Sequence, residues 1–205
     1  MTIRRILSAL VLVLGLARAA GAAEYEPLAQ PLPTADPAKV EVVEVFWYGC
    51  PHCYRLLPYM ERWLRHKPDY VLYRRLPGIL RPEWALHARA YYTAEILGVA
   101  DELHRPLFDA IHAERRPLDT EQALEDFFAE HGVDREAFRR TFRSFAVETR
   151  VRQARALMQR YGVQGTPTVI VNGKYRTDGS MAGSYADLVR VVQQLVEREA
   201  EALRR

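Results

Sequence analysis

The chain has 205 residues, with 29 lysines and arginines against 26 aspartates and glutamates. Arg4, Arg5 and Arg18 lie in an N-terminal segment without acidic residues, so the rest of the chain carries 26 basic and 26 acidic residues. This balance argues against nucleic-acid binding, which requires a basic excess on the folded domain. The chain has only two cysteines, Cys50 and Cys53, which excludes a disulfide-rich scaffold.

The first 23 residues predict a cleaved secretory signal peptide. A positive start precedes residues 6–17, which are uncharged and mostly apolar, and small residues follow as far as Ala22 and Ala23. The uncharged run stops at Arg18, short of the roughly 20 apolar residues that a membrane-spanning helix needs. We therefore expect cleavage after Ala22 or Ala23 and export to a compartment that permits disulfides.

The first elements expected after the signal peptide are a lead-in, a strand, a helix and a second strand. Residues 24–39 are rich in proline and predict an extended lead-in without stable structure of its own. Residues 40–48 are β-branched and aromatic in a nearly continuous run, which predicts a strand covered on both faces. A helix is expected over residues 50–66, and a second strand over residues 70–75 is ended by Pro77-Gly78.

The pattern then becomes helical with glycine stops from about Glu83 to Tyr161. The segment that begins with a cap at Asp134 includes Phe138, Phe142 and Phe145, whose spacing places them on one helical face. The helices expected in this block cover residues 84–97, 101–113, from a cap at Asp119 or Thr120 to 131, from Asp134 onward, and 147–161.

Strand patterns return near the C-terminal end, over residues 168–171 and 174–176. Asn172-Gly173 between them is a strong hairpin signal, and Ser184 then caps a last amphipathic helix. The element order predicts one α/β domain, formed by residues 40–82 and 162–205, that is interrupted by a helical insertion over 83–161.

The sequence Cys50-Pro51-His52-Cys53 lies where the first predicted strand meets the first predicted helix. Unpaired N–H groups and the positive end of the helix dipole favour a thiolate at Cys50, whereas Cys53 lies nearly one turn further along and is expected to be less exposed. Pro51 suits the first turn because it has no N–H to leave unpaired, and His52 adds a donor beside the Cys50 sulfur. A stabilised thiolate favours the reduced form, which makes the disulfide a stronger oxidant.

Two other roles for the dithiol have less support. A structural bridge between Cys50 and Cys53 would close a tiny loop and add little stability. The two thiolates and His52 could contribute to a metal site, but structural zinc usually takes four ligands and there is no second cysteine pair. Covalent haem needs histidine directly after the second cysteine, where this chain has Tyr54.

Two distant features are candidates for the same site. Glu44 interrupts the apolar first strand, and a buried carboxylate there would have a raised pKa and could transfer protons. The alternative is a glutamate at a strand edge that faces water. Thr166-Pro167 precedes a predicted strand, where proline shapes a turn and a cis bond is possible, although an ordinary trans proline is the alternative.

Three features together make the chain resemble the DsbA family of bacterial thiol:disulfide interchange proteins. They are the run from Phe46 to Tyr54, the Thr166-Pro167 pair, and the helical insertion. The resemblance implies a thioredoxin-like α/β fold with an inserted helical domain. It also implies a periplasmic location and a disulfide oxidase activity, without a cofactor, on newly exported proteins.

The resemblance also implies roles for individual residues. Cys50 would form mixed disulfides with substrates and Cys53 would resolve them. Pro167 matches the family's cis-proline, which with Thr166 helps to bind the substrate backbone, and Glu44 matches a buried acid credited with proton transfer. The implied reoxidant is a membrane quinone reductase of the DsbB type. One position departs from the family, because Gly49 stands where many members carry a bulkier residue.

Two rival functions remain. A periplasmic isomerase or reductase commonly dimerises through a separate N-terminal domain, whereas only residues 24–39 precede the first strand here, so we expect a monomeric oxidase. A peptide-binding or chaperone module, whose groove matters more than its thiols, is the other possibility.

Overall fold

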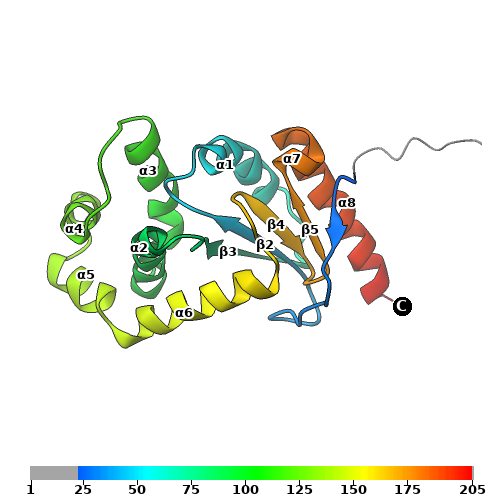
Figure 1. The fold of residues 1–205 in the computed structure, drawn as a ribbon, viewed down its shortest axis with the longest axis horizontal. Coiled ribbons are helices and arrows are strands. Elements are labelled where there is room, and N and C mark those ends of the chain that lie inside the picture. Colours follow the sequence, from blue (N-terminus) through cyan, green and yellow to red (C-terminus); the bar gives the residue numbers. More distant parts are fainter. Residues whose placement is uncertain (1–22, 205) are drawn as a thin grey trace, which may run out of the picture.

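The computed structural model describes residues 23–204, so the predicted signal peptide lies, apart from Ala23, outside the described residues. No helix within this described range is long and apolar enough to cross a membrane. The strands are β1 (Glu26–Pro27), β2 (Val40–Phe46), β3 (Val71–Pro77), β4 (Thr168–Val171) and β5 (Tyr175–Asp178). The helices are α1 (Pro51–Leu64), the 3₁₀ turn η1 (Pro82–Trp84), α2 (Ala85–Leu97), α3 (Ala100–His112), α4 (Glu121–Glu130), α5 (Arg135–Phe142), α6 (Phe145–Arg160), α7 (Gly179–Ala182) and α8 (Tyr185–Leu203) (Figure 1).

The strands form one mixed sheet in the order β1-β5-β4-β2-β3. Strand β2 pairs parallel with β3 and antiparallel with β4, and β4 pairs antiparallel with β5. Every residue of β2 is buried, as expected for a strand with neighbours on both sides and cover on both faces. Strand β2 is therefore an inner strand, and the dithiol follows a strand that is held by pairing on both sides.

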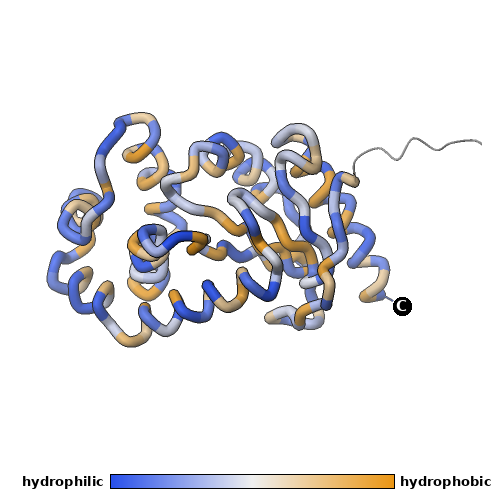
Figure 2. Tube along the Cα trace, in the orientation of Figure 1, coloured by the Kyte–Doolittle hydropathy of each residue, from blue (hydrophilic) through white to orange (hydrophobic). Residues whose placement is uncertain are grey.

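Alternation along β2 divides its side chains between two cores. Val40 and Val42 pack with apolar residues of α1 and α8, whereas Val43 and Val45 pack with residues of the helical block. The tube in Figure 2 shows hydrophobic residues along the central strands and hydrophilic stretches on the outer helices. Glu44 has the same parity as Val40 and Val42, which directs it toward the face covered by α1 and α8.

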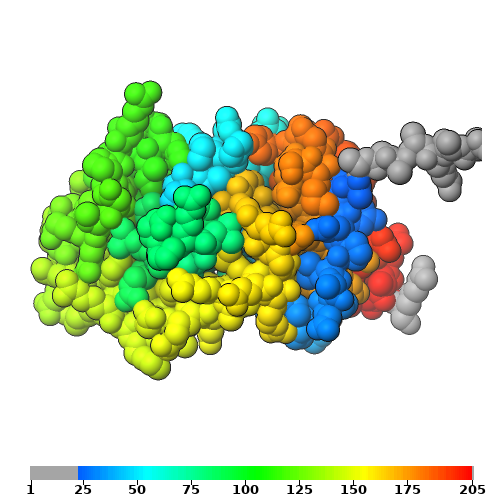
Figure 3. Space-filling view, viewed as in Figure 1, coloured from blue at the N-terminus to red at the C-terminus, as the bar shows by residue number. Residues whose placement is uncertain are grey.

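The helical block lies at one end of the molecule. Figures 1 and 3 show α2 to α6 gathered there, while the N-terminal segment lies beside α8 at the other end. Helix α2 contacts α3, α5 and α6, and thereby holds the block together. The expected α/β fold with a helical insertion is confirmed.

The predicted caps and hairpin are also confirmed. Side-chain oxygens of Thr120, Asp134 and Ser184 accept the backbone N–H three residues later, at 3.1, 2.8 and 3.0 Å. Asn172 and Gly173 both have positive φ angles, of 51° and 60°, as a tight hairpin between β4 and β5 requires.

The lead-in prediction is wrong in one respect, because residues 24–39 contribute a strand. Strand β1 pairs antiparallel with β5. Beyond it, Leu28 and Leu32 donate their backbone N–H groups to carbonyls of the β4–β5 hairpin at 2.7 and 2.8 Å. Prolines in this segment break the residue pattern that would predict a strand. An extended segment can still pair with an open sheet edge, and the sequence does not show that such an edge lies beside it.

The prediction of three phenylalanines on one helical face is also wrong. Phe138 and Phe142 are buried in α5, but Phe145 begins α6 and its side chain is 78% exposed. Ser144 caps α6 by accepting the N–H of Val147 at 3.2 Å, and this cap interrupts the helix on which the spacing depended.

Candidate active site

Cys50 is the N-cap residue of α1, and its position follows from the local backbone. Its N–H donates to the carbonyl of Trp47 at 2.9 Å, and its sulfur accepts the N–H of Cys53 at 3.4 Å. Pro51 occupies the first helical position, where its missing N–H is no loss. The Cys50 sulfur therefore lies over the unpaired N–H groups of the first turn, where a negative charge is favoured.

The two thiols have opposite electrostatic environments. The neighbouring Cys53 thiol lowers the pKa of Cys50, against the effect of burial, and Thr166 and the backbone N–H groups of Cys53 and His52 lower it further, to about 5. Burial raises the pKa of Cys53 well above its usual range, and the adjacent Cys50 adds to the effect. Their exposed fractions are 6% and 1%, so Cys50 is the more accessible sulfur.

Thr166 lies against the Cys50 sulfur and Pro167 follows it directly, next to the dithiol where the family resemblance would place both residues. The peptide bond between them is cis. The thiol of Cys50 donates to the carbonyl oxygen of Thr166 at 3.2 Å, although the two residues are 116 positions apart. The hydroxyl of Thr166 is buried beside the dithiol and acts to lower the pKa of both cysteines.

A groove of about 660 Å³ adjoins the dithiol. It lies between the start of α1, the turn before β4 and the α7–α8 junction, and it is lined by His52, Tyr59, Thr166, Pro167, Ser184 and Tyr185, among others. The rings of Tyr59 and Tyr185 lie 6.1 Å apart. The groove thus joins the cysteine pair to a mainly apolar surface on which a polypeptide could lie.

His52 is oriented differently from the expectation. Its Nδ1 atom lies 2.9 Å from the hydroxyl of Tyr185 and 3.0 Å from the guanidinium of Arg55. The hydrogen bonds of the described residues include none between the His52 ring and the Cys50 sulfur. The contribution of His52 to the lowered pKa of Cys50 comes from its backbone N–H, which belongs to the helix end.

Glu44 is buried in β2 with an exposed fraction of 3%. The hydroxyl of Tyr73 on β3 donates a hydrogen bond to its carboxylate. Burial raises the pKa of Glu44, while the Tyr73 hydrogen bond and the charge of Arg75 oppose the rise. The alternative of a strand-edge glutamate in water does not apply, because β2 lies inside the sheet and the side chain is buried.

Packing explains why position 49 is a glycine. A Cβ atom built there would lie 2.3 Å from the indole of Trp47, which is far below a normal contact. That indole stacks on Trp84 with ring centroids 4.0 Å apart, so it cannot easily move aside. The Trp47 ring therefore occupies the space that a bulkier residue at position 49 would need.

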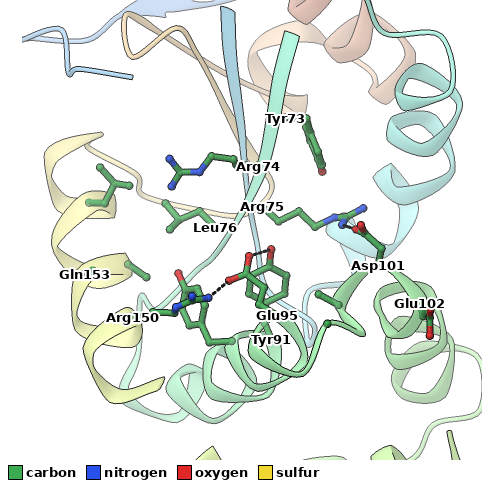
Figure 4. Close-up of a pocket in the computed structure, with 15 residues that line it drawn as sticks. Tyr73, Arg74, Arg75, Leu76, Tyr91, Glu95, Asp101, Glu102, Arg150 and Gln153 are labelled. Atoms are coloured by element: carbon green, nitrogen blue, oxygen red, sulfur yellow. Dashed lines mark hydrogen bonds and ion pairs between the residues drawn. The ribbon is translucent and has the colours of Figure 1, made fainter. Parts of the chain in front are cut away.

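A second cavity, of about 890 Å³, lies along the free edge of β3 and away from the cysteines. Figure 4 shows Arg150 and Tyr91 both meeting Glu95, and Arg75 meeting Asp101, between β3, α2, α3 and α6. These cations and acids are paired with one another, so the cavity shows no preference for a ligand charge. It is linked to the active site through Tyr73 and Arg75, which line it and both act on Glu44.

Some residues of this site were absent from the sequence prediction. Arg55 follows His52 by three positions on the same helix, so helical spacing could have indicated it. Tyr73 and Tyr185 had no such signal, because each reaches its partner only through the packing of a neighbouring strand or helix.

Comparisons with known proteins agree with this arrangement. Residues 73–190 match the family described as the DSBA-like thioredoxin domain. The thiol:disulfide interchange protein DsbA of Pseudomonas aeruginosa is 40% identical over 182 residues, which cover 89% of this chain and 86% of that protein. The corresponding protein of Burkholderia cepacia is 36% identical over 95% of this chain and 97% of its own length.

Solved structures show the same likeness. The crystal structure of Pseudomonas aeruginosa DsbA has a TM-score of 0.85 at 40% identity, covering 89% of this chain and 95% of that one. The oxidoreductase DsbA of Xylella fastidiosa has a TM-score of 0.81 at 34% identity, covering 87% of this chain and 96% of that one.

Proposed function

The chain belongs to the DsbA family of thiol:disulfide interchange proteins, and we propose on that basis that Cys50 and Cys53 form the disulfide that it donates to reduced substrate proteins. The chain is a thiol:disulfide oxidoreductase with a thioredoxin-like fold and an inserted helical domain. The different environments of the two thiols are the observation that assigns Cys50 as the sulfur that bonds to substrates and Cys53 as the resolving sulfur. One sulfur is accessible with a pKa of about 5, and the other is buried with a raised pKa.

The proposed reaction begins with the Cys50–Cys53 disulfide. A substrate thiolate attacks the sulfur of Cys50, the bond between the cysteines breaks, and Cys53 leaves and takes up a proton. A second substrate thiolate then attacks the substrate sulfur of the mixed disulfide, and Cys50 leaves as a thiolate. The substrate loses two electrons and gains a disulfide, and the enzyme gains two electrons as a dithiol.

The environment of Cys50 supports oxidation as the favoured direction. A thiolate with a pKa of about 5 is a good leaving group and remains ionised at neutral pH. The donors that stabilise it act only on the reduced form, since the disulfide sulfur carries no charge. The same donors therefore make the disulfide a stronger oxidant, which favours an oxidase over a reductase.

We further propose that Glu44 exchanges protons with Cys53. Cys53 leaves as a thiolate in a buried position, where burial favours the protonated thiol. Alternation along β2 puts Glu44 on the sheet face that α1 covers, and burial raises its pKa, so it takes up a proton more readily than a carboxyl group in water. Tyr73 would position the carboxylate for this exchange.

Thr166 and Pro167 are proposed to bind the substrate backbone beside Cys50. The proximity of the Thr166 carbonyl to the sulfur and the position of both residues in the groove support this role. A substrate cysteine that reaches Cys50 would place its flanking chain along the same groove.

The cellular setting is also part of the proposal. We infer that residues 1–23 direct export of this chain to the periplasm, as the leader pattern and the resemblance to the DsbA family imply. A DsbB-type membrane quinone reductase would return the dithiol to the disulfide.

We assign residues 83–161 to the helical insertion and residues 40–82 and 162–205 to the thioredoxin-like domain, with residues 24–39 as the lead-in that carries β1.

The proposed function is tested by equilibrating the mature protein in glutathione buffers and by oxidising a reduced two-cysteine peptide. We expect a potential well above the roughly −270 mV of thioredoxin. We also expect Cys53→Ser to trap a mixed disulfide on Cys50, whereas Cys50→Ser traps none. A potential near that of thioredoxin would contradict the oxidase assignment, and trapping on Cys53 would reverse the roles of the two cysteines.

A further inference from the structure

The groove beside the dithiol follows the start of helix α1. Two side chains of α1 line it, His52 next to Cys50 and Tyr59 about two turns further along. The nine residues from Cys50 to Tyr59 rise about 14 Å along the helix, a distance that about four residues of an extended chain would span. A substrate segment that is joined to Cys50 through its own cysteine can therefore reach Tyr59 by lying alongside α1.

Arg55 lies on the same face of α1 as these two groove residues. It follows His52 by three positions and precedes Tyr59 by four, the spacings that bring side chains together on one helical face. Its guanidinium donates a hydrogen bond to Nδ1 of His52 at 3.0 Å, so the cation contacts a side chain that lines the groove. Arg55 is about 8 Å along the helix from Cys50, which corresponds to two or three residues of an extended substrate.

The charge of Arg55 is not neutralised by the described part of the chain. The ion pairs within residues 23–204 include none that uses Arg55. The single acid of α1, Glu61, is paired with Arg105 on α3. Among the described residues that line the groove, the one carboxylate is Asp178, and its Oδ1 atom accepts two backbone N–H groups of α7 at 2.8 and 2.9 Å. The groove therefore has a positive charge beside it that is available to a substrate.

The exposed surface of α1 has the same sign of charge further along. Arg62 follows Tyr59 by three positions and is exposed, and the exposed residues of α1 include no acid. A chain that leaves the groove along this face thus meets a second positive charge and no negative one on the helix. Opposite charges on two binding partners speed their encounter, whereas like charges slow it.

We propose that Arg55 is a specificity-determining residue, which selects substrate segments that carry an acidic side chain two or three residues from the reacting cysteine. The inference rests on the proposed oxidase function and deepens it, because it names a class of substrate for the same site. Segments with a basic side chain at those positions are disfavoured.

The test uses reduced two-cysteine peptides that differ only at the second and third positions outside the cysteine pair, on both sides. These positions carry glutamate, glutamine or lysine. The Cys50–Cys53 disulfide of the mature protein takes two electrons and two protons from the peptide dithiol, which becomes a disulfide, and the rate constant is measured in a single turnover. The quantity compared between enzymes is the ratio of the rate constants for the glutamate and lysine peptides.

This ratio isolates the effect of Arg55. A glutamate near a cysteine lowers the fraction of thiolate in the peptide itself, but this effect is the same for every enzyme variant. A change in the potential of a variant acts equally on both peptides. We expect the ratio to fall about fivefold from the parent to Arg55→Met, because an exposed charge pair contributes about two- to threefold and both an attraction and a repulsion are lost.

Two further variants distinguish a local charge from other causes. Arg55→Lys keeps the charge and should retain most of the preference. Arg65→Met is the matched control, because Arg65 is exposed at the end of the same helix, about 15 Å beyond Arg55, and helical spacing turns it away from the groove. Its ratio should equal that of the parent. Raising the salt concentration from about 20 mM to about 0.5 M should weaken the preference of the parent.

Several results would overturn the inference. They are an equal ratio in the parent and in Arg55→Met, an equal fall in Arg65→Met, or a fall in Arg55→Lys as large as that in Arg55→Met. A parent protein that oxidises none of the peptides would refute the proposed function instead. Urea unfolding of each oxidised variant checks the fold, which substitutions at an exposed helix surface should preserve.

Discussion

The buried Glu44 predicts a stability that depends on pH, and Glu44→Gln is the substitution that reveals it. Glutamine has nearly the same shape, and its carbonyl can still accept the hydrogen bond from Tyr73. What disappears is a carboxylate whose pKa is raised above its ordinary value of 4.5, chiefly by burial. Because the folded protein holds this proton more tightly than the unfolded chain, the free energy of unfolding falls as pH rises between the unfolded and folded pKa values.

The magnitude follows from the size of the pKa rise. Each pKa unit by which the folded value exceeds the unfolded one lowers the free energy of unfolding by about 1.4 kcal/mol once pH exceeds the folded pKa. The glutamine variant has no carboxyl group at this position and does not lose this stability. We expect Glu44→Gln to be more stable than the parent at pH 8, and each 1.4 kcal/mol of that gain would raise Tm by about 3–6 °C for a chain of this size. Below about pH 4 the carboxyl is protonated in both states, so the difference should vanish.

Urea unfolding of the reduced protein at pH 4 and at pH 8 measures this effect. Glu201→Gln on the exposed end of α8 is the control and should change stability by less than about 0.5 kcal/mol at either pH. Tyr73→Phe has the opposite sign, because it removes a donor from a buried acceptor and should cost about 1–3 kcal/mol at pH 8. A glutamine variant that is less stable at pH 8, or equally shifted at both pH values, would show that burial does not dominate the titration of Glu44.

Three further predictions concern the dithiol and its surroundings. The thiolate absorbance of the reduced protein at 240 nm should titrate with a midpoint near pH 5 and be lost in Cys50→Ser; a midpoint of 8 or above would contradict the helix-end argument. Thr166→Val removes a buried hydroxyl that helps to lower the pKa of Cys50, so the same titration should move to higher pH while Tm is unchanged or slightly higher. Gly49→Ala should lower stability by about 1–3 kcal/mol in urea, because the added Cβ meets the Trp47 ring at 2.3 Å; an unchanged midpoint would mean that the indole moves freely.

The sequence predicted most of the elements because their signals are local. The caps at Thr120, Asp134 and Ser184 satisfy the N–H groups of their own helices, and Asn172-Gly173 turns through its own positive φ angles. Errors occurred where a second element decided the outcome. Strand β1 exists because β5 offers it an edge.

The chemistry of the site divides in the same way. Cys50, Pro51 and Cys53 lie within one helical turn, so the sequence by itself determined which sulfur lies over the helix end and why its thiolate is favoured. Resemblance to a family added Pro167 and Glu44, which no local pattern ties to the dithiol.

Only the tertiary structure decided what surrounds these residues. It turned the ring of His52 toward Arg55 and Tyr185, and it placed Tyr73 on the carboxylate of Glu44. A helix cap or a turn is stabilised by atoms of residues close to it in the chain, so the identities of those neighbouring residues are enough to predict it. A side-chain contact across 133 positions, such as that between His52 and Tyr185, depends on how α1 and α8 pack, and packing is a property of the whole chain.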